Sequence, residues 1–324
     1  MIGALAGAIE QGLIYGIMAL GVYLTFRVLD FPDLTVDGSF VTGAATAAMM
    51  IVLGYSPWIA TIVAFGAGFI AGIGTGLLHT KGGINPLLSG ILMMIALYSI
   101  NLRIMGWTVE NSVGRPNIPL LQSETIFSQV LSFATSLGIP TSFVVLVIAA
   151  VAVTLVKISV DLFLKTEIGL ALRATGDNKK MIRSFSANTD RLTILGLAIS
   201  NGLVAFAGAL IAQYGKFADV GMGIGMIVIG LASVIIGEAI FGTKSIVRIT
   251  LAVVVGAVIY RIVLALALRI DFLDTGDMKL LTAIIVVLAL ILPKRLAKIS
   301  KSRNRSKRIS PSQVKGEVSL AKHS

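Results

Sequence analysis

Residues 192–213, LTILGLAISNGLVAFAGALIAQ, form a run of 22 residues without a charged side chain. A helix needs about 20 mostly apolar residues to cross the hydrocarbon core of a bilayer, so this run predicts a membrane-spanning helix. Comparable runs occur along most of the chain, and we count nine, with eight and ten as the alternatives. They lie at residues 4–26, 39–55, 58–79, 85–105, 141–157, 192–213, 222–242, 249–269 and 279–293.

The composition of the whole chain supports the same fold class. Of 324 residues, 56% are hydrophobic and 13% are charged, and the mean hydropathy is +0.93. The charged share is about half that of an ordinary soluble domain, which excludes a water-soluble globular enzyme and also a disordered chain. The chain has no cysteine and two histidines, so we expect neither a metal site nor a catalytic residue. The predicted fold class is all-α, a polytopic transmembrane helix bundle.

The net charge of +11 is concentrated at one end of the chain. Residues 294–324 carry ten Lys or Arg against one acid, so their net charge is +9 and that of residues 1–293 is +2. A basic, serine-rich segment after the last apolar run fits a cytoplasmic tail near anionic membrane lipid. Because the tail lacks interleaved aromatic residues, membrane lipid is favoured over nucleic acid as its partner. We therefore divide the chain into a transmembrane domain at 1–293 and a basic tail, expected to be disordered, at 294–324.

Lys and Arg mark the cytoplasmic connections of a membrane protein. Seven of them lie at 157–191, which predicts a cytoplasmic loop there. Residues 106–140 hold one basic residue, Arg115, and are expected to be extracellular. Nine spans then place the N-terminus outside the cell and the basic tail in the cytoplasm, and no connection contradicts this alternation.

A polar break interrupts the apolar pattern at residues 26–40, where Pro32 disfavours helix at the preceding residue. Residues 213–225 form a second break, which follows the first span of the other half. Four spans on each side of the central run at 141–157 predict an inverted repeat, whose interrupted segments often surround a transport path. Two ordinary interfacial loops are the alternative. The candidate residues of the first break are Asp33, Asp37 and Gly38.

Polar side chains inside the apolar runs are candidates for a translocation pathway, because an unpaired charge within a membrane is costly. Glu10 and Arg261 lie within predicted spans and are a candidate ion pair, while Glu238 lies near the end of its run. Hydrogen bonding between helices is the alternative role for each polar residue. The candidate pathway residues are Glu10, Gln11, Tyr23, Asn101, Ser200, Asn201 and Arg261.

Residues 166–191, TEIGLALRATGDNKKMIRSFSANTDR, are the most informative part of the basic loop. They predict a helix to about Ala174, a turn, and a second helix with Asp177 or Asn178 as its cap. Two short helices in so charged a loop predict the docking of a soluble cytoplasmic protein. The candidate docking residues are Glu167, Gly169, Leu170, Arg173, Ala174, Gly176, Asp177 and Asn178.

This stretch resembles the coupling loop in the permease subunits of bacterial ABC importers, within the branched-chain amino acid and ribose group. The pattern of that group is approximately G-x-A-x-R-A-x-G-x-N, followed by a short helix and an N-x-D-R ending, and residues 169–191 match it. GIMALG at 16–21 and AFAGAL at 205–210 are similar to other spans of the group. The resemblance covers roughly residues 10–290.

A narrower branch of that group is indicated by three further segments, DFPDLTVDGS at 30–39, INPLL at 84–88 and NLRIMG at 101–106. They resemble permeases associated with tryptophan and tyrosine uptake. The resemblance therefore implies import of a small polar solute, an amino acid, and the narrower pattern points to an aromatic one.

The resemblance also implies a division of labour. An extracellular substrate-binding protein delivers the solute, and a second copy of this chain completes the pathway as a homodimer. Two cytoplasmic ATP-binding subunits, which hold the ATP and magnesium, drive alternating access through the loop at 167–190. We expect this chain to bind no cofactor, because its nearest approach to a phosphate-binding loop, residues 237–245, has one residue too many before the lysine. The binding protein is expected to dock at 106–140, which contains an amphipathic stretch near 124–136.

Two other function classes remain as alternatives. An ion-coupled secondary transporter needs intramembrane carboxylates for its coupling ion, and the chain offers Glu10 and Glu238. An intramembrane enzyme needs a cluster of acids, histidines or a nucleophile. The docking loop has no role in a self-powered transporter.

Overall fold

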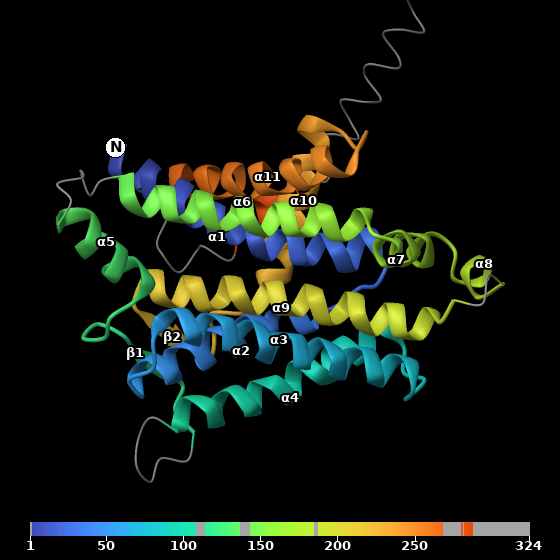
Figure 1. Ribbon diagram of the computed structural model, residues 1–324, viewed down its shortest axis with the longest axis horizontal. Coiled ribbons are helices and arrows are strands. Elements are labelled where there is room, and N and C mark those ends of the chain that lie inside the picture. The colour runs from blue at the N-terminus through green and yellow to red at the C-terminus, as the bar shows by residue number, and fades with distance from the viewer. Residues whose placement is uncertain are drawn as a thin grey trace, which may run out of the picture.

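The computed structural model describes residues 2–107, 114–136, 143–184, 187–267, 280 and 282–287, and these form a bundle of helices (Figure 1). The helices are α1 Ile2–Tyr23, continued by the short π-helix η1 Leu24–Val28, α2 Thr35–Val52, α3 Pro57–Thr80, α4 Pro86–Gly106, α5 Ile126–Ser136, α6 Val144–Lys165, α7 Glu167–Asp177, α8 Lys179–Ser184, α9 Thr189–Gly215, α10 Met226–Phe241 and α11 Ile246–Ala267. The two strands are β1 Asn117–Pro119 and β2 Phe217–Asp219.

Seven helices of the described part are long and apolar enough to cross a membrane, which confirms the prediction of an all-α, multi-span bundle. They are α1 with η1, α2, α3, α4, α6, α9 and α11. The run expected at 222–242 corresponds to α10, which has only 16 residues. The run at 279–293 lies mainly outside the described residues, as does the tail at 294–324.

The cytoplasmic loop expected at 157–191 is shorter than predicted. α6 continues to Lys165 and α9 begins at Thr189, so the connection narrows to 166–188. The charged residues near the end of α6 do not end the helix, because Lys157 Nζ lies 2.6 Å from Asp161 Oδ2 one turn further along. Asp161 also accepts a hydrogen bond of 2.6 Å from Thr250 of α11, which ties the two helices together.

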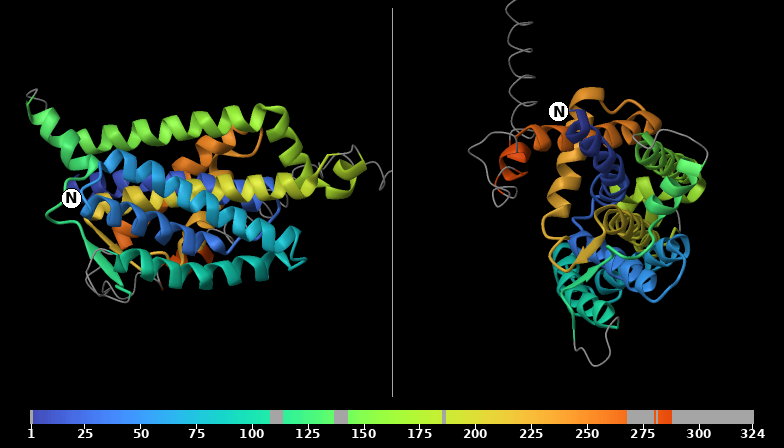
Figure 2. Two further views of the ribbon diagram at one scale, coloured as in Figure 1. Left: turned by 60° about the horizontal axis from the view of Figure 1, so that its bottom comes forward. Right: turned by 90° about the vertical axis from the view of Figure 1, so that its left-hand side faces the viewer.

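α9 lies at the centre of the bundle and packs along α2 and α3 (Figure 2). Gly68, Gly72 and Gly76 of α3 face α9 so closely that a Cβ at each position would overlap atoms of α9. Lipid provides no hydrophobic drive for helices to associate, so this close van der Waals packing of small residues holds the bundle together. On the other side of the bundle, α1 packs on α11, and Gly237 of α10 contacts the backbone of α11.

A small antiparallel sheet departs from the all-α expectation. β1 pairs with β2, with Asn117 opposite Asp219. The hydrogen bonds from Leu120 N to Lys216 O and from Val220 N to Pro116 O, both 2.8 Å, extend the pairing on either side. The sheet fastens the connection after α4 to the segment between α9 and α10. In the same connection, α5 forms where the amphipathic stretch predicts a helix.

Candidate coupling surface and membrane pockets

Side-chain caps define the two short helices of the basic loop. Thr166 Oγ1 accepts a hydrogen bond of 3.1 Å from Gly169 N and begins α7. Asn178 Oδ1 accepts one of 3.1 Å from Met181 N and begins α8, so Asn178 and not Asp177 is the cap. α7 continues to Asp177, three residues beyond the end expected at Ala174, because the turn before α8 is confined to Asn178.

α7 is held tightly against the rest of the protein along one face. Gly169 packs on the end of α6, and a Cβ at Gly176 would overlap the carbonyl of Val28 in η1. Leu172 is fully buried and packs so close to Gly196 of α9 that a Cβ at Gly196 would overlap it. A displacement of α7 therefore presses directly on η1 and on α9.

Three apolar side chains of α7 and α8 are exposed. We call them together the coupling surface; they are Ile168, Leu170 and Met181, each about half exposed. Of the residues predicted for docking, Glu167, Leu170, Asp177 and Asn178 are exposed, Arg173 and Ala174 are partly buried, and Gly169 and Gly176 serve close packing.

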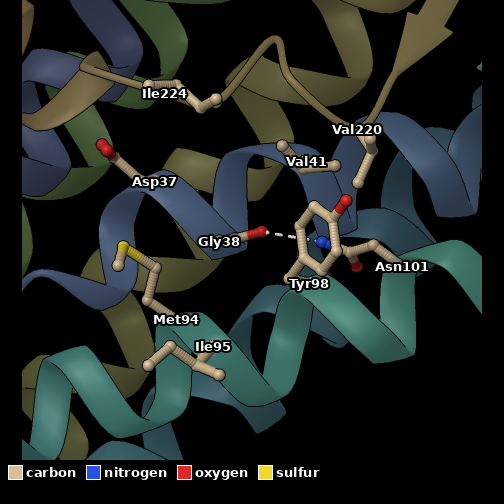
Figure 3. Close-up of a pocket in the computed structure, with 10 residues that line it drawn as sticks. Asp37, Gly38, Val41, Met94, Ile95, Tyr98, Asn101, Val220 and Ile224 are labelled. Atoms are coloured by element: carbon tan, nitrogen blue, oxygen red, sulfur yellow. Dashed lines mark hydrogen bonds between the residues drawn. The ribbon is translucent and has the colours of Figure 1, made fainter. Parts of the chain in front are cut away.

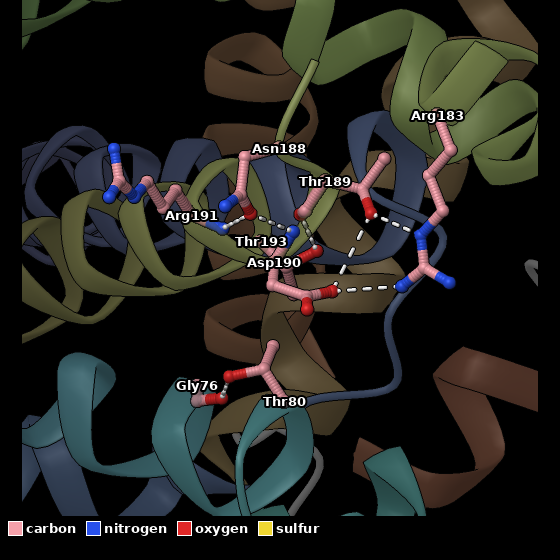
Figure 4. Close-up of polar contacts among 8 residues, drawn as sticks. All are labelled: Gly76, Thr80, Arg183, Asn188, Thr189, Asp190, Arg191 and Thr193. Carbon is pink, nitrogen blue, oxygen red and sulfur yellow. Dashed lines mark hydrogen bonds and ion pairs between the residues drawn. The ribbon is translucent and has the colours of Figure 1, made fainter. Parts of the chain in front are cut away.

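α8 is fastened to the start of α9 by a polar cluster (Figure 4). Arg183 donates to Thr189 Oγ1 at 2.9 Å and to Asp190 Oδ1 at 3.0 Å. Asn188 caps α9 by accepting from the backbone N–H groups of Asp190 and Arg191. Movement of α8 is thus transmitted to the first turn of α9.

The break predicted after the first span is buried within the protein. Phe31 N donates to Thr25 O at 2.9 Å, and Asp33 Oδ1 accepts from Thr35 N at 2.9 Å. Asn201 Nδ2 donates to Asp33 Oδ2 at 2.7 Å.

The same break lies well inside the bundle. Asn201 follows the start of α9 at Thr189 by twelve residues, which is about 18 Å along a helix axis. Because Asn201 binds Asp33, α2 begins inside the membrane-spanning part of the protein rather than at its edge. Ser39 of α2 donates to Asn201 Oδ1 at 2.6 Å and completes this network.

The second break re-enters the bundle and meets the first one. Asp37 of α2 accepts hydrogen bonds from Gly225 N at 2.9 Å and from Ile227 N at 2.8 Å, so it caps the N-terminus of α10. Gly225 has a φ of +88°, a value that glycine adopts without strain. We call residues 220–225 the re-entrant loop. α2 and α10 therefore both begin in the interior, with the carboxylate of one at the N-terminus of the other.

A pocket of about 400 Å³ lies between α2, α4 and the re-entrant loop (Figure 3). We call it the Asp37 pocket. Its walls are mainly apolar, and Tyr98 and Asn101 of α4 contribute polar atoms. Asn101 Nδ2 donates to Gly38 O at 3.2 Å, while its buried Oδ1 has no hydrogen-bond partner in the described part of the chain. The lining residues are Asp37, Gly38, Val41, Met94, Ile95, Tyr98, Asn101, Val220, Gly223 and Ile224.

The candidate ion pair between Glu10 and Arg261 does not form. The described residues contain three ion pairs, and this one is not among them. Glu10 accepts a hydrogen bond of 2.9 Å from the Tyr214 hydroxyl, and the guanidinium of Arg261 lies over the ring of Tyr15, 4.0 Å from its centre. Each of the two charged groups therefore contacts a tyrosine instead.

The remaining predicted pathway residues take different positions. Ser200 donates to Gly21 O at 2.7 Å between two helices, and Tyr23 is packed in the hydrophobic core. Ser200, Tyr23 and Asn201 do not line the Asp37 pocket. Gln11 is partly buried on α1. Among the predicted pathway residues, Asn101 alone lines the Asp37 pocket, together with Asp37 and Gly38 of the first break.

Sequence reasoning missed several residues of these sites. Arg27 of η1 forms a bidentate ion pair with Glu238 at the end of α10, and Arg27 stands at the edge of its apolar run as any flanking residue does. Tyr15 and Tyr98 lie in spans that are otherwise apolar. An aromatic hydroxyl among apolar residues is a weak signal, because most such residues only fill space.

The chain belongs to the family of permease components of branched-chain amino acid transport systems, whose family model matches residues 4–297. It is therefore a multi-pass transmembrane permease subunit of an ABC importer, which confirms the resemblance. Members of this family work with ATP-binding and substrate-binding components.

Its relatives include permeases for several solutes. A tyrosine transport system permease protein of Clostridioides difficile is 43% identical over 306 residues, which cover 92% of this chain and 97% of that protein. An uncharacterised protein of Rickettsia prowazekii is 35% identical and covers 89% and 97%. A fructose import permease protein of Bifidobacterium longum is 28% identical and covers 75% and 65%. No solved structure matches the chain significantly.

Proposed function

We propose that this chain forms half of the translocation pathway in an ATP-driven importer for an aromatic amino acid, and that two copies assemble as a homodimer. The observation that carries the proposal is the coupling surface, three exposed apolar side chains on two short, capped helices in a basic loop. Exposed apolar side chains in so charged a loop favour a protein partner. The partner proposed here is the ATP-binding subunit, which holds the ATP and magnesium.

Contacts inside the protein support a route for the motion. α7 presses on η1 through Gly176 and Val28, and η1 is joined to α10 by the ion pair of Arg27 with Glu238. α10 begins at the re-entrant loop, which lines the Asp37 pocket. A shift of the docked α7 therefore changes the pocket, as alternating access requires.

The orientation follows from the distribution of charge. The basic loop with the coupling surface and the tail at 294–324 face the cytoplasm of a bacterial cell, and the tail lies near anionic lipid. The end of the bundle with β1, β2 and α5 then faces outward, where the substrate-binding protein docks on the connection at 106–140.

The identity of the solute rests on a relative. The 43% identity to a tyrosine transport permease extends over nearly all of both chains.

Reconstitution tests this function. Proteoliposomes that contain the chain and its ATP-binding subunit should take up labelled L-tyrosine only when ATP and the binding protein are both present. Arg173→Glu should abolish uptake and reduce co-purification of the ATP-binding subunit, while the chain still inserts. Lys81→Glu, an exposed charge reversal in the turn between α3 and α4, is the matched control and should leave uptake unchanged. Uptake by the chain alone under a proton or sodium gradient would instead establish a secondary transporter.

A further inference from the structure

A second pocket, of about 380 Å³, lies on the other side of the re-entrant loop. We call it the Arg261 pocket. It is lined by Tyr15 of α1, by Met222 and Ile224 of the re-entrant loop, by Met226 of α10 and by Arg261 of α11. Ile224 also lines the Asp37 pocket, so the re-entrant loop separates the two pockets.

Arg261 is held in place but is not neutralised by the described residues. Its guanidinium lies over one face of Tyr15, 4.0 Å from the ring centre, while Phe40 is stacked with the same ring at 6.0 Å. Arg261 Nε is buried and has no hydrogen-bond partner among the residues that the structure describes. Within the described part of the chain, no carboxylate lies within ion-pair distance of Arg261.

An arginine of a membrane-spanning helix that no described carboxylate neutralises needs an explanation. The guanidinium is always charged, and keeping it in a membrane without an anion is costly, so such residues commonly serve substrates. Its N–H groups form a planar fork that matches a carboxylate with two parallel hydrogen bonds. The stack of Phe40, Tyr15 and Arg261 holds this fork ready.

We propose that the Arg261 pocket binds the carboxylate of the transported amino acid, an inference that rests on the proposed function. Met222, Met226 and the ring of Tyr15 then contact the apolar part of the solute. The volume is near the lower end of ordinary small-molecule pockets, which suits a single amino acid. Glu10 is not within ion-pair distance of Arg261 and accepts a hydrogen bond from the Tyr214 hydroxyl.

Binding to the full-length wild-type chain in lipid nanodiscs tests which group is recognised. Bound tritiated L-tyrosine is measured by scintillation proximity against two competitors. 3-(4-Hydroxyphenyl)propionate keeps the carboxylate and lacks the ammonium group, whereas tyramine keeps the ammonium group and lacks the carboxylate. We expect the acid to compete at least about tenfold better than tyramine. Equal competition, stronger competition by tyramine, or no binding of tyrosine would overturn the proposal.

Substitutions then assign the recognition to Arg261. Arg261→Gln should weaken binding of L-tyrosine at least about tenfold, and Arg261→Lys should weaken it less, because the charge remains and the fork is lost. Arg248→Gln removes an exposed arginine from the same helix and should bind as the wild type does. Wild-type affinity in Arg261→Gln would overturn the proposal. If Arg261→Gln fails to fold, the Lys variant and the competitor series decide.

Transport separates this inference from the proposed function. Wild-type importer that takes up tyrosine with ATP, combined with binding that is indifferent to Arg261, would overturn the pocket assignment alone. Wild-type importer that takes up no tyrosine would overturn the proposed solute, whatever the binding experiment shows.

Discussion

Removing the carboxylate of Asp37 should release the first turn of α10. Asp37 accepts two backbone hydrogen bonds, from Gly225 and Ile227, and a hydrogen bond to a charged group contributes about 1.5–3 kcal/mol. Loss of a helix cap alone costs about 0.5–2 kcal/mol. We therefore expect Asp37→Ala to lower the free energy of local opening there by about 3 kcal/mol, which is roughly 100-fold in the opening equilibrium. Asp37→Asn keeps an acceptor and should lose about 1 kcal/mol.

Hydrogen exchange measured by mass spectrometry reports this opening directly. Peptides that cover 221–229 should exchange roughly 100-fold faster in Asp37→Ala, and several-fold faster in Asp37→Asn. Asp177→Ala deletes an exposed carboxylate from α7 and should leave these peptides unchanged. Exchange within twofold of the wild type in Asp37→Ala would refute the assignment of Asp37 as the cap that joins the two breaks.

Two further predictions concern packing and charge. The double variant Arg27→Glu with Glu238→Arg should recover part of the stability that either single variant loses. The recovered free energy of unfolding is about 1 kcal/mol or less, because the Arg27 side chain is 57% exposed. Changes in melting temperature that simply add in the double variant would contradict the ion pair. Gly72→Val should abolish the peak of folded protein in size-exclusion chromatography, because its Cβ overlaps the α9 backbone. Gly66→Ala on the same helix faces open space and should raise the free energy of unfolding by about 0.5–1 kcal/mol. Equal yields of the two variants would exclude close packing at Gly72.

The spans and the coupling loop were accessible from local sequence, whereas boundaries and pairings were not. Apolar length predicted the spanning helices, and Asn178 was one of two caps expected for α8. The end of α6 was placed too early, because charged residues at 157 and 161 neutralise one another within the helix. The pairing of β1 with β2 was missed because strands of three residues show no periodicity, and these strands are about a hundred residues apart.

The pockets show the same limit more sharply. Asp37 was singled out as part of a polar break, but its partners Gly225 and Ile227 lie nearly 190 residues further along the chain. Arg261 was expected to pair with Glu10 because the two were the opposite charges available in spans. In the folded chain, Arg261 instead contacts the ring of Tyr15, and Glu10 binds the hydroxyl of Tyr214. Packing decides which of several polar neighbours is within reach.

Sequence alone thus determined that this protein is a bundle of membrane-spanning helices with a basic loop of two short helices, because apolar length and charge are properties of contiguous residues. Tertiary structure alone decided that α2 and α10 begin in the interior, that Asp37 joins them, and that Arg261 stands over Tyr15 beside a pocket. The physical reason is that the backbone hydrogen bonds of each spanning helix are made within that helix and do not specify its neighbours. Side-chain packing alone selects which helix faces meet.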